Sequence, residues 1–457
     1  MKKEINKDLF ENIKVSKAVR IMAVPTIIGQ LIVLIYNMAD TFFIGRTGNP
    51  YMVAAASLIL PIFNISISVA SIAGVGGGAL LSRLLGEDRE DEAKKVFSFS
   101  VFLSAALAIF FSLLVLIFME PLLNVLGADD ATFEFARKYA MCVIVLGALP
   151  TILTNVLSNM VRSIGESGKA GFGVTMGGII NIFLDPLFMF VILAPGNEIL
   201  GAGIATCISN VISCVYFIIT VLKLGENSVL RLCRISELPQ NDSIRQIFSV
   251  GIPSAVATFL FDMDYVVLDK LMSGYGNIAL ASVGIVLKAE RLPLNVGIGI
   301  CQGMVPIVAY NYASKNYKRM EDVAKFSLKI GVVFALISIC MYEVFAPFIM
   351  RFFIDDGETV AVGTTFLRIR CLATVLMFMS FYHVHLFNSY GHGKEALFLG
   401  VMRWAVFNIP MLFLLNYIFG MYGLVWSQLV ADILTVSLSL WTHHRFKKKL
   451  MAATVAW

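Results

Sequence analysis

The sequence predicts an all-α integral membrane protein, with twelve transmembrane helices arranged as two pseudo-symmetric six-helix bundles. Three observations lead to this fold class. The 457-residue chain is 58% hydrophobic and only 15% charged, with a mean hydropathy of +0.81. Apolar runs of membrane length recur along it, and short motifs of its first half return in its second half. A soluble domain carries about a quarter charged residues, so a bilayer is the environment that can absorb this apolar surface.

The expected helices follow one another with short polar connections between most of them. Each apolar run spans roughly 20 residues or more, which is the length needed to cross the hydrocarbon core. The predicted spans cover residues 19–44, 51–82, 96–118, 136–161, 172–193, 198–222, 247–272, 278–310, 326–349, 361–389, 397–419 and 421–442. Because the number of spans is even, both ends of the chain are expected on the same side of the membrane.

The distribution of Lys and Arg predicts which side that is. Basic residues gather in residues 1–20, in the alternate connections that begin with 83–95, and in the tail 445–449. The opposite connections are acidic around Asp129 and Asp355. Cytoplasmic loops of membrane proteins carry the excess of Lys and Arg, so we expect both termini in the cytoplasm. Residues 1–20 hold no long apolar run and do not have the pattern of a cleavable signal peptide.

The longest polar connection, residues 223–245, divides the chain into two halves. The predicted divisions are a cytoplasmic N-terminus at 1–18, a first six-helix bundle at 19–224, a cytoplasmic linker at 225–246, a second bundle at 247–444 and a basic cytoplasmic tail at 445–457. The segments that recur are Pro25 and Pro253, 74–78 and 303–306, and 163–169 and 389–394. Because each half has an even number of spans, we expect parallel repeats related by an axis along the membrane normal, with a central cavity between them.

Polar residues at membrane depth in the first half predict an ion site. Asn37 and Asp40 are three residues apart in the first span, so they share one helix face. Asn181 and Asp185 are four apart in the fifth span, and Pro186 then frees a backbone carbonyl one turn earlier. Two carboxylates with amides and a freed carbonyl suit a proton or a sodium ion. The alternative is that each Asp hydrogen-bonds to a neighbouring helix, although Asn would serve that purpose at lower cost.

The spans of the second half carry a different set of charges. Asp262 and Asp264 lie in the span 247–272, while Lys288, Glu290 and Arg291 lie in the span 278–310. Ion pairing between these two helices and contact with a substrate are both open interpretations. Other ionisable residues within or near spans are Arg368, Arg370, Arg403 and Asp432. We expect Arg403 to extend to the cytoplasmic face, as long basic side chains near helix ends do.

Other motifs exclude several classes of protein and site. The seven cysteines are scattered, and His383 and His385 point to different helix faces, so neither a disulfide framework nor a metal pair is expected. The segment 74–78 lies inside an apolar helix and predicts close helix packing, while 165–170 lacks the spacing and the Ser or Thr of a phosphate loop. With no ATP-binding domain and no HExxH or GxSxG motif, we expect no enzyme, no cofactor and no nucleic-acid partner.

Three motifs resemble one known family. Residues 38–45 (Met-Ala-Asp-Thr-Phe-Phe-Ile-Gly) and 181–186 (Asn-Ile-Phe-Leu-Asp-Pro) are similar to the first-helix and fifth-helix signatures of the multidrug and toxic compound extrusion (MATE) family. Residues 303–312 (Gly-Met-Val-Pro-Ile-Val-Ala-Tyr-Asn-Tyr) are similar to its eighth-helix signature, in the form of the MepA-like branch. The resemblance covers roughly residues 15–445, with the motifs in the right order on the right helices.

The resemblance implies a V-shaped pair of bundles that export amphipathic, cationic small molecules in exchange for H⁺ or Na⁺ by alternating access. By motif, Asp40, Asn181 and Asp185 match the cation site of the first bundle, which would hold Na⁺ between the two acids if Na⁺ is the coupling ion. Asn155 and Thr206 match its polar neighbours, Asn37 lies beside it, and Pro25 matches the proline at which the first helix bends. The residues expected at the substrate cavity are Asp262, Asp264, Lys288, Arg291 and His383.

The expected partners are drug-like small molecules, the coupling ion and membrane lipid, for a monomer in a bacterial inner or plasma membrane. The main alternative is a flippase for lipid-linked saccharides with a related two-bundle fold. That alternative favours a large cationic cavity for phosphate. A channel is a further alternative, but no filter-like loop is present in the sequence.

Overall fold

The computed structural model describes residues 7–224, 228–234, 237, 239 and 241–455, and in these residues every regular element is a helix. The first half of the described chain (7–224) contains α1 (Lys7–Glu11), α2 (Val15–Arg46), α3 (Pro50–Gly86), α4 (Glu90–Ile117), α5 (Met119–Val125), α6 (Phe133–Ala140), the π-helix η1 (Met141–Leu146), α7 (Ala148–Ser163), α8 (Ser167–Leu187), the π-helix η2 (Phe188–Ile192) and α9 (Glu198–Leu224). Parts of the predicted N-terminus, linker and tail lie outside the described residues.

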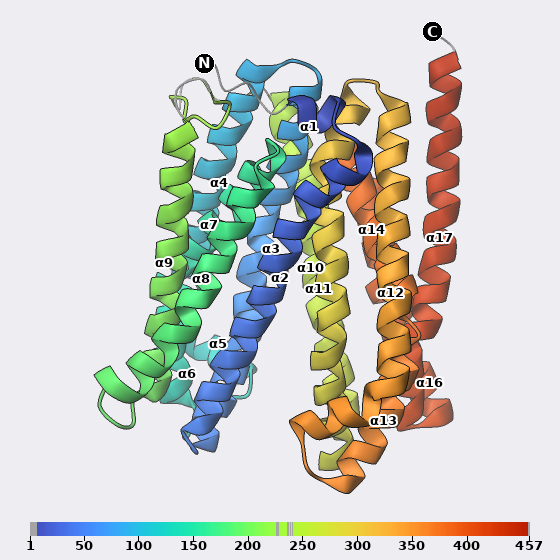
Figure 1. Ribbon diagram of the computed structural model, residues 1–457. Helices are drawn as coiled ribbons and strands as arrows, with labels where there is room; N and C mark the ends of the chain where they lie inside the picture. Colours follow the sequence, from blue (N-terminus) through green and yellow to red (C-terminus); the bar gives the residue numbers. More distant parts are fainter. Residues whose placement is uncertain (1–6, 225–227, 235–236, 238, 240, 456–457) are drawn as a thin grey trace.

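The second half (241–455) repeats the pattern of long helices and short breaks. It contains α10 (Asn241–Ser273), α11 (Asn277–Ala313), α12 (Tyr317–Phe353), α13 (Gly357–Cys371), α14 (Thr374–Tyr390), α15 (Gly393–Val401), the π-helix η4 (Met402–Asn408), α16 (Ile409–Phe419) and α17 (Met421–Val455). The two halves stand next to each other with their long helices roughly along one direction (Figure 1).

The helices of the described residues are long and apolar enough for a multi-pass membrane protein. Ten single helices are long and apolar enough to cross a membrane. The number of spans rises to as many as twelve if each of two bent helix pairs is counted as one span. One pair, 133–163, bends by 44° where Gly147 follows the π-helix η1, and π segments are a known cause of such kinks. The other pair, α13 with α14, bends by 45°. The predicted all-α membrane fold is thereby confirmed.

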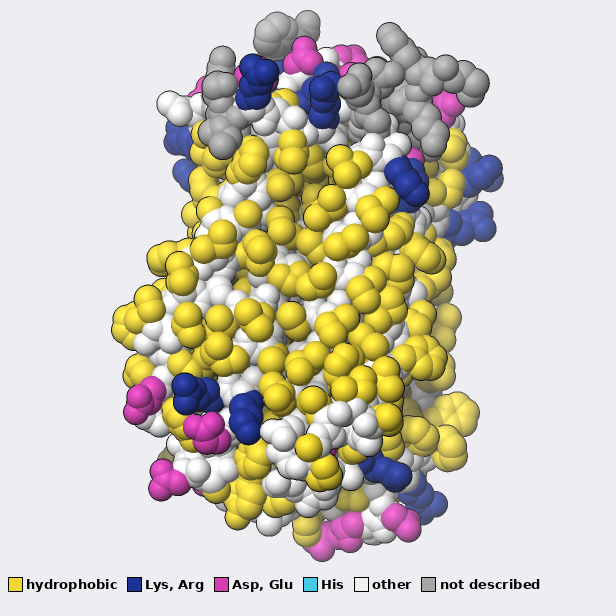
Figure 2. All heavy atoms as spheres, turned by 90° about the vertical axis from the view of Figure 1, so that its left-hand side faces the viewer, with side chains coloured by type: hydrophobic (Ala, Val, Ile, Leu, Met, Phe, Trp, Pro, Cys, Tyr) yellow, Lys and Arg dark blue, Asp and Glu magenta, His cyan; other side chains and the backbone are white. Residues whose placement is uncertain are grey.

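The surface of the molecule has the layering that a bilayer requires. Figure 2 shows hydrophobic side chains over the middle of one face, with acidic and basic side chains gathered toward its two ends. Large hydrophobic side chains are exposed on long helices of both halves, including Phe110, Ile117, Phe183 and Phe348. Lipid tails can cover such side chains at no cost in free energy, whereas water cannot.

The two halves share one hydrophobic core near the termini and have separate cores at the opposite end. The shared core joins residues of both halves, among them Phe10, Leu80, Ile247 and Tyr310. A second core holds only first-half residues and a third core only second-half residues. Figure 1 accordingly shows the ribbons of the two halves close together near N and C and farther apart at the other end, where the end of α2 and the start of α11 diverge. We call these the closed end and the open end.

Glycines allow the halves to approach closely at the closed end. A Cβ on Gly76 of α3 would lie 2.2 Å from the Ile247 carbonyl oxygen of α10. A Cβ on Gly303 of α11 would lie 2.7 Å from the Ala23 Cα of α2. The second long helix of each half therefore packs on the first long helix of the other half, as expected of two related repeats. The prediction that 74–78 is a packing motif and not a phosphate loop is confirmed.

The short helix α1 ties the N-terminal segment to the second half. Phe10 stacks on the Tyr310 ring with 4.8 Å between ring centroids, and the Tyr310 hydroxyl donates to Glu11 at 2.5 Å. Arg319 of α12 donates to the backbone carbonyls of Leu9, Phe10 and Ile13. Because α2 continues into the first half, α1 links the two halves across the closed end.

Candidate functional site

Two carboxylates, one buried and one partly buried, lie inside the first half. Asp185 of α8 is fully buried, and Asn181 one turn earlier donates to its Oδ1 at 3.1 Å. Asn181 also lies 3.3 Å from the Thr206 hydroxyl of α9. Asp40 of α2 accepts a hydrogen bond from the Tyr139 hydroxyl at 3.1 Å and lies within electrostatic reach of Asp185. We call Asp40, Tyr139, Asn181, Asp185 and Thr206 the acid cluster.

Three oxygens of the acid cluster make no hydrogen bond within the described protein. They are Asp40 Oδ1, Asp185 Oδ2 and Asn181 Oδ1, and all three are buried. A buried carboxylate needs a partner for its charge, and the protein supplies only hydroxyl and amide donors here. These three oxygens without partners therefore fit one of two ligands. One is a proton on either carboxyl group, and the other is a sodium ion bound by carboxylate and amide oxygens. In the described part of the chain, no group of three or more His, Cys, Asp or Glu is placed to hold a metal ion.

Two other residues of the predicted ion site take different positions. Asn155 of α7 donates to the Thr151 carbonyl at 3.0 Å and lines the large cavity described below. Asn37 is exposed, and among the described residues it makes no hydrogen bond to either acid, so its side chain is not part of the acid cluster. Tyr139 was missed, because a tyrosine in an apolar span carries no signal of which helix it will face.

A cavity of about 400 Å³ lies between the two halves. Its volume is within the range of sites for drug-sized ligands. Its first-half lining includes Tyr36, Asn155, Arg162, Asn181, Thr206 and Asn210, and its second-half lining includes Phe261, Gln302, Phe381, His385, Arg403 and Trp404. Because Asn181 and Thr206 are also members of the acid cluster, the cavity and the carboxylate pair share side chains. No Asp or Glu is among the described residues that line it.

Two polar contacts join the halves beside this cavity. Gln30 of α2 donates to Gln302 of α11 at 3.1 Å, and both side chains are in the cavity lining. Asn64 of α3 donates to Asp262 of α10, also at 3.1 Å. Asp262 therefore lies at the interface between the halves, although it is not in the lining of the cavity itself.

Of the two interpretations of the charges on α10 and α11, ion pairing between these helices is wrong. No Asp262 or Asp264 oxygen lies within 4.0 Å of the nitrogen of Lys288 or of Arg291 in the described structure; Lys288 is exposed, and Arg291 lies over the Tyr265 ring, 5.1 Å from its centroid. The buried pairs that do form join other helices. They are Glu290 with Arg370 at 2.7 Å and Asp432 with Arg403 at 3.0 Å.

The expected position of Arg403 is also wrong. Its side chain is 3% exposed and lies over the rings of Phe381 and Trp404, at 4.6 and 4.1 Å from their centroids, instead of extending to an aqueous face. His383 lies near His443, with 5.7 Å between ring centroids, and its Nδ1 is 2.8 Å from the Met379 carbonyl. The histidine in the cavity lining is His385. Asp264, Lys288, Arg291 and His383 are thus outside the described lining.

The second half contains a counterpart of part of the acid cluster. The Asn408 side-chain amide donates to the buried Asp264 carboxylate at 2.7 Å and to the side-chain Oε1 of Gln428 at 3.4 Å. Asn181 makes the same two kinds of contact, to Asp185 and Thr206, in the first half. An amide thus bridges a buried carboxylate and a neighbouring helix in each half.

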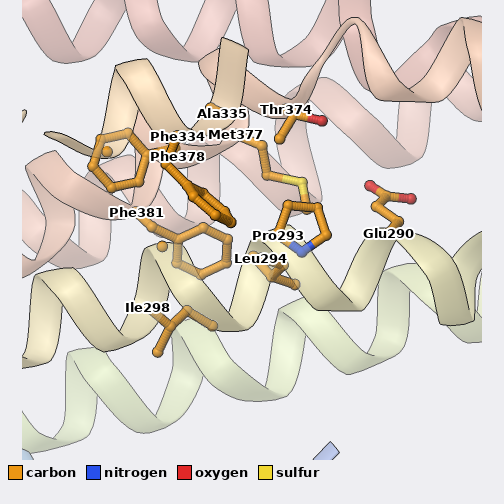
Figure 3. A pocket seen from close by; sticks show the side chains of 12 residues that line it. Glu290, Pro293, Leu294, Ile298, Phe334, Ala335, Thr374, Met377, Phe378 and Phe381 are labelled. Atoms are coloured by element: carbon orange, nitrogen blue, oxygen red, sulfur yellow. The ribbon is translucent and has the colours of Figure 1, made fainter. Parts of the chain in front are cut away.

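A second, much smaller pocket lies inside the second half. Its volume of about 10 Å³ is roughly that of one water molecule. Figure 3 shows aromatic and aliphatic side chains around it, including Phe334, Phe378 and Phe381, with Glu290 at one edge. A Cβ on Gly331 would lie 1.8 Å from the Phe378 ring, so this region is tightly packed. It adjoins the large cavity through Ile298 and Phe381 but cannot hold a drug-sized ligand.

Two related membrane bundles, a cavity between them and carboxylates buried beside that cavity define a polytopic membrane transporter. The MatE family model matches residues 25–187 and 253–414, one segment in each half. The chain belongs to the MatE family, and the resemblance of its three motifs is confirmed. It is a transporter and not an enzyme.

Similar proteins agree with this assignment. The chain is 32% identical over 425 residues to the multidrug export protein MepA of Staphylococcus saprophyticus subsp. saprophyticus, with 93% of this chain and 92% of that protein covered. It is 32% identical over 428 residues to the multidrug export protein MepA of Staphylococcus aureus (strain MSSA476), with the same coverage. A solved multidrug resistance MATE family transporter of the MOP superfamily, in an outward-facing conformation, has a TM-score of 0.91 at 21% identity, over 98% of this chain and 99% of that one. A crystal structure of MATE in complex with MaL6 has a TM-score of 0.90 at 21% identity with the same coverage.

Proposed function

We propose that this chain is a secondary active multidrug efflux antiporter, which exports amphipathic small molecules in exchange for H⁺ or Na⁺ by alternating access. The observation that carries the proposal is the sharing of Asn181 and Thr206 between the cavity and the acid cluster. A ligand in the cavity and an ion at the carboxylates would contact the same side chains. The names of the MepA relatives support export of drugs as the direction and type of transport.

The cavity has the properties of a site for varied apolar molecules. Aromatic side chains such as Tyr36, Phe261 and Trp404 offer flat apolar surfaces, and the amides of Asn155 and Gln302 offer adaptable hydrogen bonds. A substrate of drug size could enter from the open end or leave through it. Inward movement of the coupling ion provides about 2.3 kcal/mol per charge for each 100 mV of membrane potential, before any concentration gradient.

Ion binding would act on the cavity through the acid cluster. A proton or Na⁺ at Asp40 and Asp185 neutralises the carboxylates and changes the hydrogen bonds that Asn181 can make. We propose that α2 then bends at Pro25, where its carbonyl packs so closely on α8 that a Cβ on Gly171 would lie 2.4 Å from it. Narrowing of the first-half side of the cavity would weaken substrate binding. Because coupling is reciprocal, substrate binding would in turn favour release of the ion.

The membrane location, the orientation, the oligomeric state and the bundle boundaries are also proposals. The bias of Lys and Arg supports an orientation with both termini in the cytoplasm. We also propose a bacterial inner or plasma membrane as the location and a monomer as the active form. In that orientation the open end faces the outside of the cell. The division into bundles at 19–224 and 247–444, with a linker at 225–246, is part of the same proposal.

The charge of the cavity bears on the substrate class. The expected preference for cations is not part of the proposal, because the described lining offers no carboxylate to attract them. The two arginines in the lining, Arg162 and Arg403, favour a second candidate function, the flipping of a lipid-linked saccharide phosphate. Against it, Arg403 already pairs with Asp432 and leaves one arginine for a group that carries several charges.

Drug-driven ion flux in proteoliposomes tests the proposed antiport. Purified protein is reconstituted, H⁺ and Na⁺ gradients are imposed in separate experiments, and movement of a fluorescent amphipathic drug is followed. We expect uptake against the drug gradient with one ion and not with the other. Transport of lipid-linked saccharide without any ion dependence would favour the flippase, and absence of gradient-driven transport with every drug tested would contradict the antiporter.

A further inference from the structure

A buried arginine faces the large cavity without an acidic partner. Arg162 lies in the last turn of α7, is 6% exposed and lines the cavity. Its guanidinium donates to the side-chain Oδ1 of Asn159 at 3.1 Å and to the Ser158 hydroxyl at 3.5 Å. Its Nε makes no hydrogen bond, and no described carboxylate lies within salt-bridge distance. A buried, unpaired charge is costly, so its presence at a cavity wall indicates a ligand that supplies the missing partner.

The other charges around the cavity do not compensate Arg162. Arg403 is the other arginine of the lining, and Asp432 at 3.0 Å neutralises it. The acid cluster meets the cavity at Asn181 and Thr206, and no Asp or Glu is among the described residues that line the cavity. Among these lining residues, Arg162 is therefore the charged side chain without an acidic partner.

The fold itself does not require an arginine at this position. Helices α7 and α14 end in the same way, at Gly165 with φ +89° and at Gly391 with φ +79°. Three residues before each glycine stands a polar residue that lines the cavity, Arg162 in the first half and Asn388 in the second. Since the uncharged Asn388 serves at the related position, the positive charge of Arg162 is a feature of the cavity and not of the helix end.

We propose that Arg162 is the substrate-recognition residue for amphipathic molecules that carry a carboxylate, and that the cavity prefers them to otherwise identical molecules without that charge. The proposal rests on the proposed function, because it assigns a substrate class to the cavity of that transporter. The guanidinium presents several N–H donors in a plane that matches the two oxygens of a carboxylate. Apolar and aromatic walls, such as Val33 and Phe381, would hold the rest of the molecule.

A matched pair of fluorescent probes tests this preference by equilibrium binding to the purified full-length protein in detergent. One probe is a rhodamine with a free benzoate group, and the other is its methyl ester, which has the same ring system without the carboxylate. We expect the wild-type protein to bind the carboxylate at least about tenfold more tightly than the ester. A hydrogen-bonded charge of this kind is typically worth about 10- to 100-fold in affinity.

Variants of Arg162 then assign the preference to this side chain. Arg162→Gln should weaken carboxylate binding by about 10- to 100-fold and leave ester binding within about threefold, while Arg162→Lys keeps part of the preference. Arg351→Gln, which removes a charge from an exposed position of α12, is the control and should change neither affinity.

Equal or tighter binding of the ester by the wild-type protein, or no binding of either probe, would overturn the inference without any variant. An unchanged carboxylate preference in Arg162→Gln would also overturn it. Gradient-driven transport of the ester in proteoliposomes is judged separately, so the antiporter proposal can stand when the carboxylate preference fails.

Discussion

The Asn181 amide donates to the Asp185 carboxylate at 3.1 Å while the same side chain lines the cavity between the two halves. A single side chain therefore touches both the place where an ion would bind and the place where a substrate would bind. This relationship gives the coupling of the two sites a physical route that needs no long chain of contacts. It also makes Asn181 the residue where coupling can be altered without removing either carboxylate.

Replacement of Asn181 should weaken coupling more than it weakens folding. Asn181→Val removes the donor to Asp185, and loss of a hydrogen bond to a buried carboxylate costs about 1.5–3 kcal/mol. We expect substrate binding to persist but to lose its dependence on H⁺ or Na⁺ concentration. Asn408→Val removes the related bond to Asp264 in the second half and is the matched control. It should destabilise the protein by a similar amount in thermal unfolding, yet keep the ion dependence. Identical ion dependence in both variants would argue against the acid cluster.

Labelling of introduced cysteines tests the membrane orientation. Asn241→Cys at the start of α10 and Asp130→Cys in the connection between α5 and α6 both place the thiol at an exposed position. In a background without the native cysteines, a membrane-impermeant maleimide added to intact cells should label position 130 and not position 241. Labelling at 241 alone would reverse the proposed orientation.

Removal of one partner from the buried Glu290–Arg370 pair should strongly destabilise the protein, whereas removal of both should not. Arg370→Leu leaves a buried carboxylate without its 2.7 Å partner, which costs about 3–5 kcal/mol and should lower Tm in detergent. The double change Glu290→Leu with Arg370→Leu should recover much of the loss. Arg368→Leu affects an exposed pair with Glu343 at 3.7 Å, and such pairs contribute about 0–1 kcal/mol. Similar Tm values for Arg370→Leu and Arg368→Leu would contradict this interpretation.

Contacts of Arg319 with α1 should stabilise the closed end. The guanidinium donates to three backbone carbonyls between Leu9 and Ile13, and Arg319→Ala removes all of these bonds. Spin labels at positions 90 and 318, both exposed near the closed end, would report the separation of the halves. We expect a longer-distance population to grow in Arg319→Ala. Lys329→Ala, at an exposed position of the same helix, should leave the distances as in the wild type.

The sequence predicted well what depends on one helix at a time. Apolar runs gave the helix positions, and the spacing of Asn181 and Asp185 placed both on one face of α8, where the structure has them joined. Prediction failed where the partner comes from another helix. Asp262 bonds to Asn64, 198 residues away, because the packing of α3 on α10 sets which faces meet. Arg162 gave no signal, since an arginine near a helix end is equally typical of a surface position, and only the assembled cavity distinguishes the two.

The most direct test of the central claim is ion-driven transport by Asp40→Asn and Asp185→Asn in proteoliposomes. Each amide imitates a neutralised carboxyl group but cannot take up and release a proton or bind Na⁺ in turn. We predict folded variants that bind substrate, fail to accumulate it under either gradient, and are scarcely worse when combined. Asp130→Asn, at an exposed position, should transport normally. Full gradient-driven transport by Asp40→Asn would contradict the proposed coupling site.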